Sequence, residues 1–523
     1  MFATLVLSLA ALPATFLVWS ALSFRSNLIK ARAIGLPVLV RYVTPSNLLW
    51  MAWGSKLVRL ARRLGIATEN FDRFYLFGWE GNERYKVYAQ LGDAFTLVTP
   101  GGNWIYVADP DAVWEALKRP REFGRNLEQL AVLDVYGRSL STTEGQEWQK
   151  HRKITAATFT EKNNEFVWHS SLAQAKGMLE YWMHRAPQPV RSVAEDCKTF
   201  TLNVLAAALF SKPYPFEGLE EMQQRRSEPS ENSDGAYQYR DSLSRKQTGE
   251  AVADFRSYVL NMVEEEKANV ENGNTGRRDL VSALVRASLK QRKAGRDMTV
   301  TEEEIVSNTF VYGFAGNDTT AITLAHTIVN LAAYPRLKDW IAEEICQCQA
   351  VIMEFLRLCH SLGSSSKLTK EATSLTVNGK RYVIPQNTNV QLNFCGLHTN
   401  AKIRGESALD WNPARFIEPT NEQIGSSIKS ERLRQSPEKK YLPWSWGERV
   451  CPGKRFSQVE LTATLAVLFR EHHVDPVPET SESIADSRKR AQRISMDIQM
   501  TLLNEMYKSE RVGLRWMLRN ALW

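Results

Sequence analysis

A single long helical segment constrains the fold of this chain more than any other feature. Apolar residues continue in a helical pattern from Thr301 to about Ala333, Thr301 and Glu304 match a capping box, and Pro335 ends the helix. Helical patterns dominate positions 145–335, whereas strand-like patterns lie on either side. With 43% hydrophobic and 10% aromatic residues, the chain has the composition of a folded globular protein. We therefore predict one large helical domain with small β-sheets, a mainly α fold of the α+β type.

The strand-like stretches are short and are joined by recognisable turns. The stretch AFTLVTPGGNWIYV predicts two strands joined at Pro100-Gly101-Gly102, and Asn378-Gly379 is typical of a tight hairpin turn. Further helices are predicted from Asp109-Pro110-Asp111 through Leu117, from Asp339 to about Leu358, and after Cys451. Two polar segments, 212–250 and 419–440, are predicted to be loops.

The amino-terminal segment carries no charged side chain from Met1 to Phe24. At about 1.5 Å per residue, a helix of this length can cross a hydrocarbon core of about 30 Å. Basic residues follow the segment and none precedes it, which by the positive-inside rule places the rest of the chain in the cytosol. We predict an uncleaved membrane anchor at 1–24, a linker or hinge at 25–60 and the main domain at 61–523. A cleaved signal peptide is the alternative, because small residues surround Ala14, although a preceding basic segment is missing.

The net charge indicates which partners the protein would bind, and the number and spacing of cysteines indicate its compartment. The net charge of +8, with an isoelectric point near 9.0, favours anionic partners such as acidic proteins or lipid headgroups. The basic residues are scattered, which argues against nucleic acid. The six cysteines are sparse and irregularly spaced, as in a reducing compartment. Cys346, Cys348 and Cys359 with His360 make a poor zinc site, because helical positions two apart point to different faces.

The stretch WSWGERVCPGKRF, residues 444–456, places one cysteine between two glycines and several cations. If Cys451 binds a metal it must be a thiolate, and an isolated anion inside a protein needs stabilising groups around it. Pro452 suits the first position of a helix, which makes Cys451 a candidate N-cap with backbone N–H groups directed at its sulfur. Gly447 and Gly453 let the backbone approach a flat object, and Arg449 offers a cation to an acidic group on it.

A flat macrocycle with carboxylates and an iron that accepts one thiolate describes haem. Attachment through two cysteines and a histidine is absent, so the haem would be bound non-covalently. Taken alone, a structural cysteine is the simpler interpretation. The pattern Trp444, Gly447, Arg449, Cys451, Gly453 nevertheless resembles the haem-binding loop of the cytochrome P-450 family, with Trp444 in place of the usual phenylalanine. The resemblance implies the cytochrome P-450 fold, with Cys451 as the axial ligand of the haem iron.

A second motif, FAGNDTT at 314–320, lies inside the long helix although Gly316, Asp318 and Thr319 disfavour helix interiors. Such a conflict often marks a functional site, although a polar stripe on a surface helix is the alternative. The stretch resembles the family's oxygen-activation segment, in which Gly316 would make room for a ligand and Asp318 and Thr319 would guide protons. Asn317 forms a glycosylation sequon with Thr319, which we dismiss because the segment should be buried and cytosolic.

A third motif, EFLR, brings Glu354 and Arg357 to one helical face. Most such pairs are surface ion pairs that contribute little. Together with Arg415 in WNPARF, they resemble the family's Glu-Arg-Arg structural triad. We therefore assign them a structural role and not a catalytic one.

The fourth motif is WQKHR, in which Trp148 and Arg152 lie four residues apart on one helical face. The motif is weak by itself. It resembles the pair that faces a haem propionate in the family, and His151 is predicted to be a surface neighbour.

Together these resemblances imply a membrane-anchored haem-thiolate monooxygenase of the microsomal type, most similar to fungal members, with 61–523 as its catalytic domain. Such an enzyme binds haem b, receives NADPH electrons through a separate flavoprotein reductase, accepts cytochrome b5 as a further partner, and sits in the endoplasmic reticulum membrane with its catalytic domain in the cytosol. It would insert one oxygen atom from dioxygen into a lipophilic substrate by hydroxylation or epoxidation, in secondary metabolism. Four basic residues are predicted to attract the reductase: Lys150, Lys153, Lys454 and Arg455.

Two alternatives remain. One is a haem-thiolate isomerase or dehydratase that rearranges a peroxide without external electrons, against which the acid–alcohol pair of Asp318 and Thr319 argues. The other is a non-catalytic or impaired haem-binding relative, because the 35 positions from Thr319 to Glu354 are fewer than the family usually has.

Overall fold

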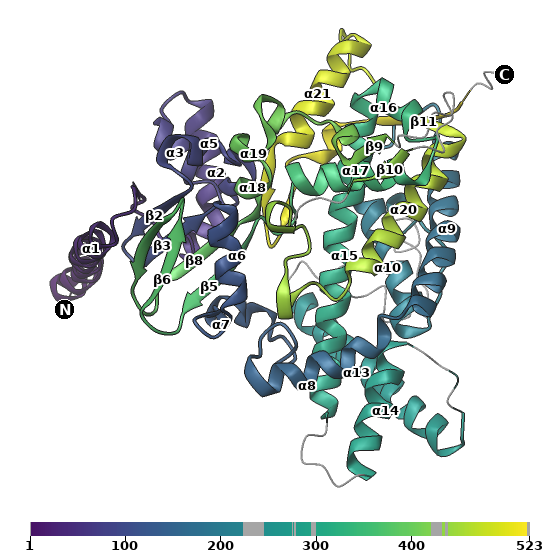
Figure 1. Ribbon diagram of the computed structural model, residues 1–523, viewed down its shortest axis with the longest axis horizontal. Coiled ribbons are helices and arrows are strands. Elements are labelled where there is room, and N and C mark those ends of the chain that lie inside the picture. Colours follow the sequence, from purple (N-terminus) through teal and green to yellow (C-terminus); the bar gives the residue numbers. More distant parts are fainter. Residues whose placement is uncertain are drawn as a thin grey trace.

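The fold is described from a computed structural model of the chain (Figure 1). The structure describes residues 2–222, 245–274, 276, 279–293, 300–419, 431–434 and 438–519, with side chains from residue 15 onward except those of 245–248, 292–293, 419 and 438. A smaller part rich in strands lies to the left in Figure 1, and a larger helical part lies to the right. This arrangement confirms the predicted mainly α fold with small sheets.

The main sheet has six strands in the order β1-β2-β3-β8-β5-β4. Their bounds are β1 (Val38–Val40), β2 (Ala94–Thr99), β3 (Gly102–Val107), β4 (Phe123–Arg125), β5 (Ser364–Thr369) and β8 (Asn389–Asn393). β2 and β3 form the predicted antiparallel hairpin, in which Thr99 pairs with Gly102. β3 and β8 run parallel, so the sheet joins chain segments nearly 300 positions apart.

Smaller sheets are all antiparallel pairs: β6 (Thr373–Val377) with β7 (Lys380–Ile384), β9 (Ile417–Pro419) with β10 (Glu431–Leu433), β11 (His472–Pro476) with β14 (Leu514–Leu518), and β12 (Ile498–Met500) with β13 (Asn504–Met506). The predicted hairpin turn joins β6 to β7. Asn378 and Gly379 both have positive φ there, which explains the preference for these two residues.

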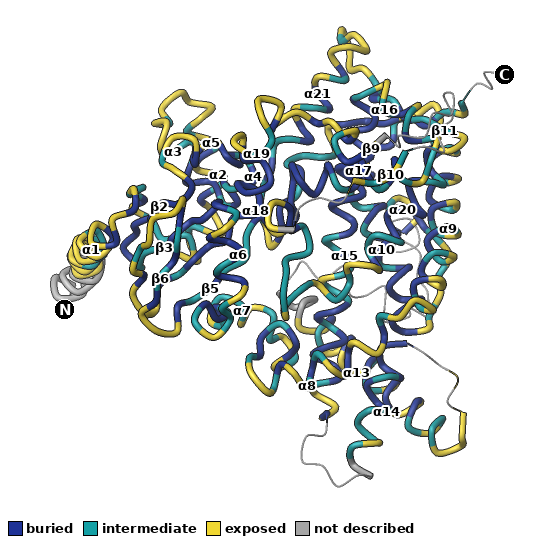
Figure 2. Tube along the Cα trace, viewed as in Figure 1, coloured by how far each residue is buried: buried dark blue, intermediate teal, exposed yellow. Residues whose placement is uncertain are grey.

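The helical part is built around α15 (Glu302–Ala333), which is mostly buried along its length (Figure 2). Thr301 caps it, and both hydrogen bonds of the predicted capping box with Glu304 form. Around it lie α8 (Gly145–Thr155), α9 (Glu161–His184), α10 (Val193–Phe210), α13 (Arg245–Glu271), α14 (Leu280–Lys293), α16 (Pro335–Trp340), α17 (Ile345–Leu358), α20 (Lys454–Arg470) and α21 (Ile484–Met496).

Shorter helices surround the sheet: α3 (Glu69–Phe74), α4 (Trp79–Glu83), α5 (Lys86–Leu91), α6 (Pro110–Lys118), α7 (Leu127–Leu130), α18 (Phe394–His398) and α19 (Ala401–Arg404). Asp109 caps α6 through a hydrogen bond from the Ala112 N–H, as its position before Pro110 predicts. Two helices precede the sheet in the chain, α1 (Phe2–Ile34) and α2 (Leu48–Arg63).

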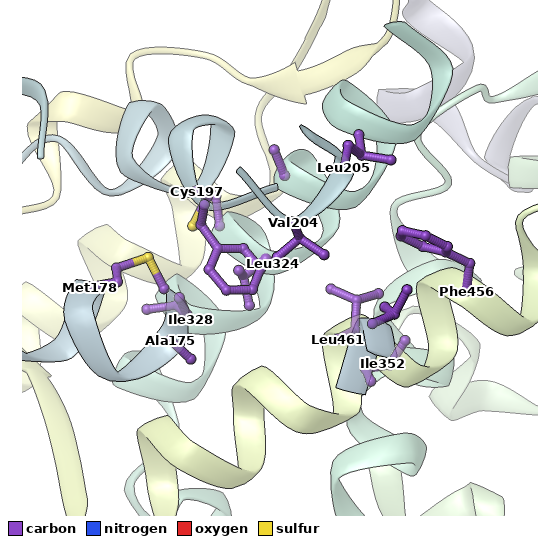
Figure 3. Close-up of a cluster of buried hydrophobic side chains, with 14 of the residues drawn as sticks. Ala175, Met178, Cys197, Val204, Leu205, Leu324, Ile328, Ile352, Phe456 and Leu461 are labelled. Atoms are coloured by element: carbon purple, nitrogen blue, oxygen red, sulfur yellow. The ribbon is translucent and has the colours of Figure 1, made fainter. Parts of the chain in front are cut away.

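The largest hydrophobic core joins α9, α10, α15, α17 and α20. Figure 3 shows its centre, where Val204 of α10 lies next to Leu324 of α15. A second core lies between the main sheet, α6 and the β6–β7 hairpin. The large core therefore fixes α15 and α20, the two helices next to the predicted site.

The predicted anchor coincides with the first part of α1, which continues ten residues past Phe24. Side chains of residues 1–14 lie outside the described part of the chain. In the part of the chain that the structure describes, no helix combines the length and the apolar character needed to cross a bilayer. The anchor, and the predicted boundaries at 24 and 60, which fall inside α1 and α2, stay predictions.

Three other predicted segments differ in part from the structure. The helix expected from Asp339 to Leu358 is two helices, α16 and α17, separated by a turn at 341–344. Most of the predicted 212–250 loop lies outside the described residues, and α13 already begins at Arg245. Within the predicted 419–440 loop, Glu431–Leu433 forms strand β10, because its backbone pairs with the strand after Arg415.

Candidate functional site

The three residues of the predicted triad meet at one buried point. Glu354 accepts hydrogen bonds from Arg357 Nε at 2.7 Å and Nη2 at 2.9 Å, and from Arg415 Nε at 3.1 Å. Arg357 also donates to the carbonyl oxygens of Ala408 at 2.5 Å and Asp410 at 3.0 Å. Glu354 and Arg357 have no exposed surface, so the pair depends on this complete set of partners. The triad ties α17 to the segment before β9.

Two buried histidines connect this region to the loop that carries Cys451. His398 Nε2 accepts a hydrogen bond from the Leu442 N–H at 2.8 Å, and His360 Nε2 donates to the Pro443 carbonyl at 2.9 Å. His360 Nδ1 accepts from the Leu362 N–H at 3.2 Å, which fits only the neutral ring. Burial lowers the pKa of His360 to about 4 and that of His398 well below its ordinary value. Neutral imidazoles thus hold the backbone that leads into the cysteine loop.

We expect His360 to make stability pH-dependent between about pH 6.5 and 4. Its folded pKa of about 4 lies below the ordinary value of about 6.5, so on acidification the unfolded chain takes up a proton that the native state does not. Stability present above pH 6.5 is therefore lost as the pH falls through this window. Thermal unfolding between pH 7.5 and 4.5 measures the loss, and His360→Gln should show a shallower dependence. An identical pH dependence in the variant would contradict this role.

Cys451 lies in the turn before α20. Its backbone N–H donates to the Trp444 carbonyl at 2.9 Å. The sequence predicts Cys451 as the N-cap of α20, but the N-cap is Gly453. The reason is that Pro452 and Gly453 form a turn ahead of the helix. Burial raises the pKa of the Cys451 thiol, whereas a hydrogen bond from the Gly453 amide lowers it. The predicted approach of backbone amides to the sulfur is therefore present, with different helix geometry.

Cys451 also differs from the other five cysteines in exposure. Cys451 is exposed, Cys346 is half-buried and the remaining four are buried. Yet enough protein surrounds Cys451 for burial to be the main influence on its pKa. Cys451 is therefore an exposed residue whose thiol is partly desolvated, which is the setting expected of a ligand-binding cysteine and not of a core cysteine.

The rest of the cysteine loop adopts a defined shape. Gly447 has a φ of 80°, a left-handed conformation that favours glycine. Trp444 Nε1 donates to Ser457 Oγ at 3.1 Å, so its ring is tied to the first turn of α20. Both residues thus set the path of the loop around Cys451.

Arg449 points from this loop to α8. Its Nη2 donates to the Thr143 carbonyl at 2.9 Å, and its guanidinium lies 4.0 Å from the centre of the Trp148 ring. Burial lowers the pKa of Arg449 to about 10, and the charges of Arg125 and Arg152 add to this effect. The predicted residues Trp148, Arg152 and Arg449 are therefore brought together.

Two further cations join this group that the sequence did not single out. Arg125 and Lys367 face each other across β4 and β5. Burial, together with the charges of Arg125 and Arg449, lowers the pKa of Lys367 to about 8. Glu144 opposes both Lys367 and Arg449, and Glu448 also opposes Arg449. Because like charges face each other here, an anionic ligand would stabilise the cluster.

The residues of the FAGNDTT stretch, 314–320, lie on different faces of α15. Thr319 Oγ1 donates to the Ala315 carbonyl at 2.7 Å, and Ala315 is exposed in the middle of an otherwise largely buried helix. Asp318 is half-buried and lies on the same helical face. A Cβ on Gly316 would lie 3.0 Å from Leu205 of α10, so this glycine permits close helix packing. Ala315 is thus the exposed point of this stretch, with the half-buried Asp318 and Thr319 on the same face, whereas Gly316 packs close to Leu205.

Tyr312 places the cysteine loop next to α15. Its hydroxyl donates to Thr155 Oγ1 of α8 at 2.8 Å. Burial raises the pKa of Tyr312 to about 12, and the nearby Cys451 thiol contributes to the rise. α8, α15 and the cysteine loop therefore meet around one site that offers a sulfur ligand, a cationic edge and an acid–alcohol pair.

Comparison with protein families decides what kind of site this is. The family model described as cytochrome P450 matches residues 80–348 and 347–502. The chain belongs to the cytochrome P450 family. It is 27% identical to a cytochrome P450 monooxygenase of Arthrobotrys oligospora, over 91% of this chain and 93% of the relative. It is also 25% identical to a cytochrome P450 monooxygenase of Penicillium rubens, over 85% and 87% of the two chains.

Solved structures agree on the fold of this cytochrome P450. A zebrafish cytochrome P450, solved with abiraterone, superimposes with a TM-score of 0.63 over 84% of this chain and 100% of that chain, at 20% identity. These results confirm the predicted family and fold, and identify the chain as an oxidoreductase of the haem-thiolate type.

The residues of this cytochrome P450 fit a haem group. Cys451, an exposed residue, offers its sulfur to the iron. After burial, the charge of Arg125 lowers the pKa values of both Lys367 and Arg449, which marks a surplus of positive charge that two propionates can neutralise. The sequence missed Arg125 and Lys367 because neither belongs to a local motif; only the pairing of β4 with β5 brings them to the site.

Two predictions for α8 are wrong. His151 is 2% exposed, not a surface residue, because its Nδ1 contacts Asn308 Nδ2 at 2.7 Å across the α8–α15 interface. Lys150 is not free to attract a partner, because its Nζ lies 2.8 Å from both carboxylate oxygens of Glu304. Lys153, Lys454 and Arg455 are exposed, as that prediction requires.

We expect Lys367→Met to stabilise the haem-free protein and to weaken haem binding several-fold. The pKa of Lys367 is lowered to about 8, so its charged form is unfavourable without an anion and favourable beside a propionate. Thermal unfolding of apoprotein and absorbance titration with haem measure the two effects. Lys370→Met is the matched control, because Lys370 pairs with Glu144 at 3.0 Å at the edge of the cluster. A lowered apoprotein melting temperature together with unchanged haem affinity would contradict the assignment.

Proposed function

We propose that this cytochrome P450 inserts one atom of dioxygen into a lipophilic organic substrate, by hydroxylation or epoxidation, in secondary metabolism. The second oxygen atom leaves as water, which requires two electrons and two protons per turnover. Haem b, when bound, supplies the activation of dioxygen. The observation that carries the proposal is the exposed Cys451 beside a cationic edge and beside the stretch of α15 that exposes Ala315.

The side chains take distinct roles in this proposal. Cys451 ligates the iron, and its electron donation favours cleavage of the O–O bond. Arg449 and Arg152, with Trp148 beside them, hold propionates, and Trp444, Gly447 and Gly453 shape the loop. On the other side, Asp318 and Thr319 deliver protons. Thr319 Oγ1 keeps its lone pairs available while its proton is directed to the Ala315 carbonyl, so it can accept a proton donor and pass a proton on.

The names of relatives support secondary metabolism. A phomenoic acid biosynthesis cluster cytochrome P450 monooxygenase of Leptosphaeria maculans is 22% identical over 91% of this chain and 92% of the relative. Secologanin synthase 2 of Catharanthus roseus is 22% identical over 72% and 74%. At these identities the class of reaction is supported, and the substrate is not named.

Electrons would come from NADPH through a separate flavoprotein reductase, with cytochrome b5 as a further partner. Lys153, Lys454 and Arg455 offer exposed positive charge near the cysteine loop for an acidic partner. The proposed location is the endoplasmic reticulum membrane, with residues 1–24 as a single anchor and the catalytic domain, 61–523, in the cytosol.

The shortened interval between α15 and Glu354 favours an impaired relative as the second candidate. The family match consists of two stretches that meet at residues 347 and 348, inside this interval. The structure nevertheless forms the triad after a turn of four residues, 341–344. Because Glu354 reaches both arginines, the shorter connection leaves the triad intact and favours an active enzyme.

Two measurements on the purified full chain test the proposal. Reduction under carbon monoxide should give the red-shifted Soret band for which the family is named, and NADPH with reductase should drive product formation. A band at the position of a haem without a thiolate, or no haem, would favour the impaired relative. Turnover of a peroxide without reductase would favour an isomerase or dehydratase.

A further inference from the structure

Asn308 of α15 is a buried amide that holds three neighbouring groups at once. Its Nδ2 donates to the Glu304 carbonyl at 2.6 Å and to His151 Nδ1 at 2.7 Å, and its Oδ1 accepts from the Leu140 N–H at 3.0 Å. A backbone carbonyl can only accept and a backbone N–H can only donate, so these two partners fix the orientation of the amide. Because Asn308 is 1% exposed, water does not compete for any of the three contacts.

The orientation of Asn308 also fixes the tautomer of His151. Asn308 presents an N–H to Nδ1, so Nδ1 accepts and the ring proton lies on Nε2, which is 3.6 Å from a carboxylate oxygen of Glu304. Burial lowers the pKa of His151 and the charge of Lys150 adds to this effect, while the Glu304 carboxylate opposes it. The neutral ring of His151 therefore completes the set of partners around Asn308.

The Leu140 amide belongs to a turn that precedes α8, residues 137–143. Ser307 Oγ donates to the Gly137 carbonyl at 2.6 Å, so two successive residues of α15 hold this turn. Hydrogen bonds between its own side chains and backbone close the turn. Its position relative to α15 therefore follows from the position of Asn308 and its neighbour.

The carbonyl groups of the same turn orient Arg449 of the cysteine loop. Arg449 Nη2 donates to the Thr143 carbonyl at 2.9 Å, and Nη1 donates to the Leu140 carbonyl at 3.4 Å. Leu140 is thus held by Asn308 through its N–H and holds Arg449 through its carbonyl. A continuous series of contacts leads from His151, by way of Asn308 and the turn, to the guanidinium.

We propose that Asn308 and His151 are positioning residues for Arg449: they hold the 137–143 turn so that the guanidinium keeps the orientation in which it binds a haem propionate. The inference rests on the proposed role of Arg449 toward a propionate. A cation held beside a propionate slows haem loss and favours the reduced, less positive iron. Loosening the turn should therefore speed haem loss and lower the reduction potential. The alternative is that the Asn308–His151 contact only joins α8 to α15.

Two measurements on the purified, haem-loaded full chain test the proposal: the rate of haem transfer to apomyoglobin and the reduction potential of the bound haem. His151→Leu removes the acceptor, whereas His151→Asn keeps one, because the asparagine Oδ1 takes the place of Nδ1. Arg449→Met removes the cation. His326→Leu is the matched control, because His326 is a second buried histidine, 1% exposed, whose ring packs on Phe355 of α17.

We expect His151→Leu to speed haem transfer several-fold and to lower the reduction potential, and His151→Asn to remain close to the unsubstituted protein. In the Arg449→Met background, His151→Leu should have no further effect, since the contact acts through that arginine. His326→Leu should change neither quantity. Asn308→Ala carries the same expectations as His151→Leu, and replaces it in the test if His151→Leu gives no folded protein.

Equal effects of His151→Leu with and without Arg449 would overturn the proposal, because the contact would then act only by joining two helices. An effect of His326→Leu as large as that of His151→Leu would overturn it too. If Arg449→Met changes haem transfer while His151→Leu and Asn308→Ala do not, this inference alone fails. If Arg449→Met itself changes nothing, the proposed role of Arg449 fails, and the inference fails with it.

Discussion

Replacing Cys451 with alanine is expected to abolish the red-shifted Soret band of the reduced, carbon monoxide-treated protein and, with it, reductase-dependent oxidation. The thiolate is the group that distinguishes this ligation from a haem held by other residues, and it donates the electron density that helps break the O–O bond. Among the six cysteines, Cys451 alone is exposed, so no other thiol is placed to substitute for it. The loss should be essentially complete.

The matched control is Cys346→Ala, which removes the half-buried cysteine in α17. It should keep both the band and the activity. Haem content should be measured for both variants, because Cys451→Ala can still bind haem through the cationic edge formed with Arg449 and Lys367. An alanine variant with an unshifted band and full turnover would remove the basis of the proposed function.

Glu354→Gln is expected to destabilise the fold by about 3–5 kcal/mol, the usual cost of removing one partner from a buried ion pair. The amide keeps the shape of the carboxylate but leaves the Arg357 charge uncompensated at a point with no exposed surface. It also weakens the contact with Arg415, which Glu354 holds at 3.1 Å. We therefore expect a low yield of haem-loaded protein and a large fall in the free energy of unfolding measured with urea.

Glu406→Gln is the control for this substitution, because Glu406 is exposed and lies near the same segment. It should change the free energy of unfolding by less than about 0.5 kcal/mol. If the two variants unfold alike, Glu354 is not the centre of a buried network. The prediction also bears on the short connection before α17, since a functioning triad requires that this connection place Glu354 correctly.

Local chemistry explains which parts of the fold could be predicted from sequence. The start of α15 follows from Thr301 and Glu304, which form the two hydrogen bonds of a capping box within four residues. The β6–β7 turn follows from Asn378 and Gly379, whose positive φ angles few other residues adopt easily. The family and the triad could likewise be predicted, because their residues occur in short motifs that can be recognised without knowledge of any long-range contact.

Where the prediction failed, a contact between distant segments was the reason. His151 belongs to α8, a short basic helix. It is nevertheless buried, because α8 packs on α15, where Asn308, 157 positions further along the chain, contacts the His151 ring. The packing of Leu205 of α10 against Gly316 could not be predicted for the same reason, whereas the role of Gly316 toward a ligand stays a prediction. Even the N-cap of α20 depends on the turn at Pro452 and Gly453.

The amino-acid sequence by itself determined the chemistry of this protein: one thiol in a glycine-flanked loop, an acid–alcohol pair inside a long helix, and a Glu-Arg pair on one helical face. Only the tertiary structure decided which charges surround that thiol, because Arg125 and Lys367 reach it through the pairing of β4 with β5. It also decided that Leu57 and Leu60 of α2 face outward, since Val58 on the other face of the helix is fully buried. Local motifs specify reactive groups, whereas burial and electrostatic environment arise from contacts between segments that are remote in the chain.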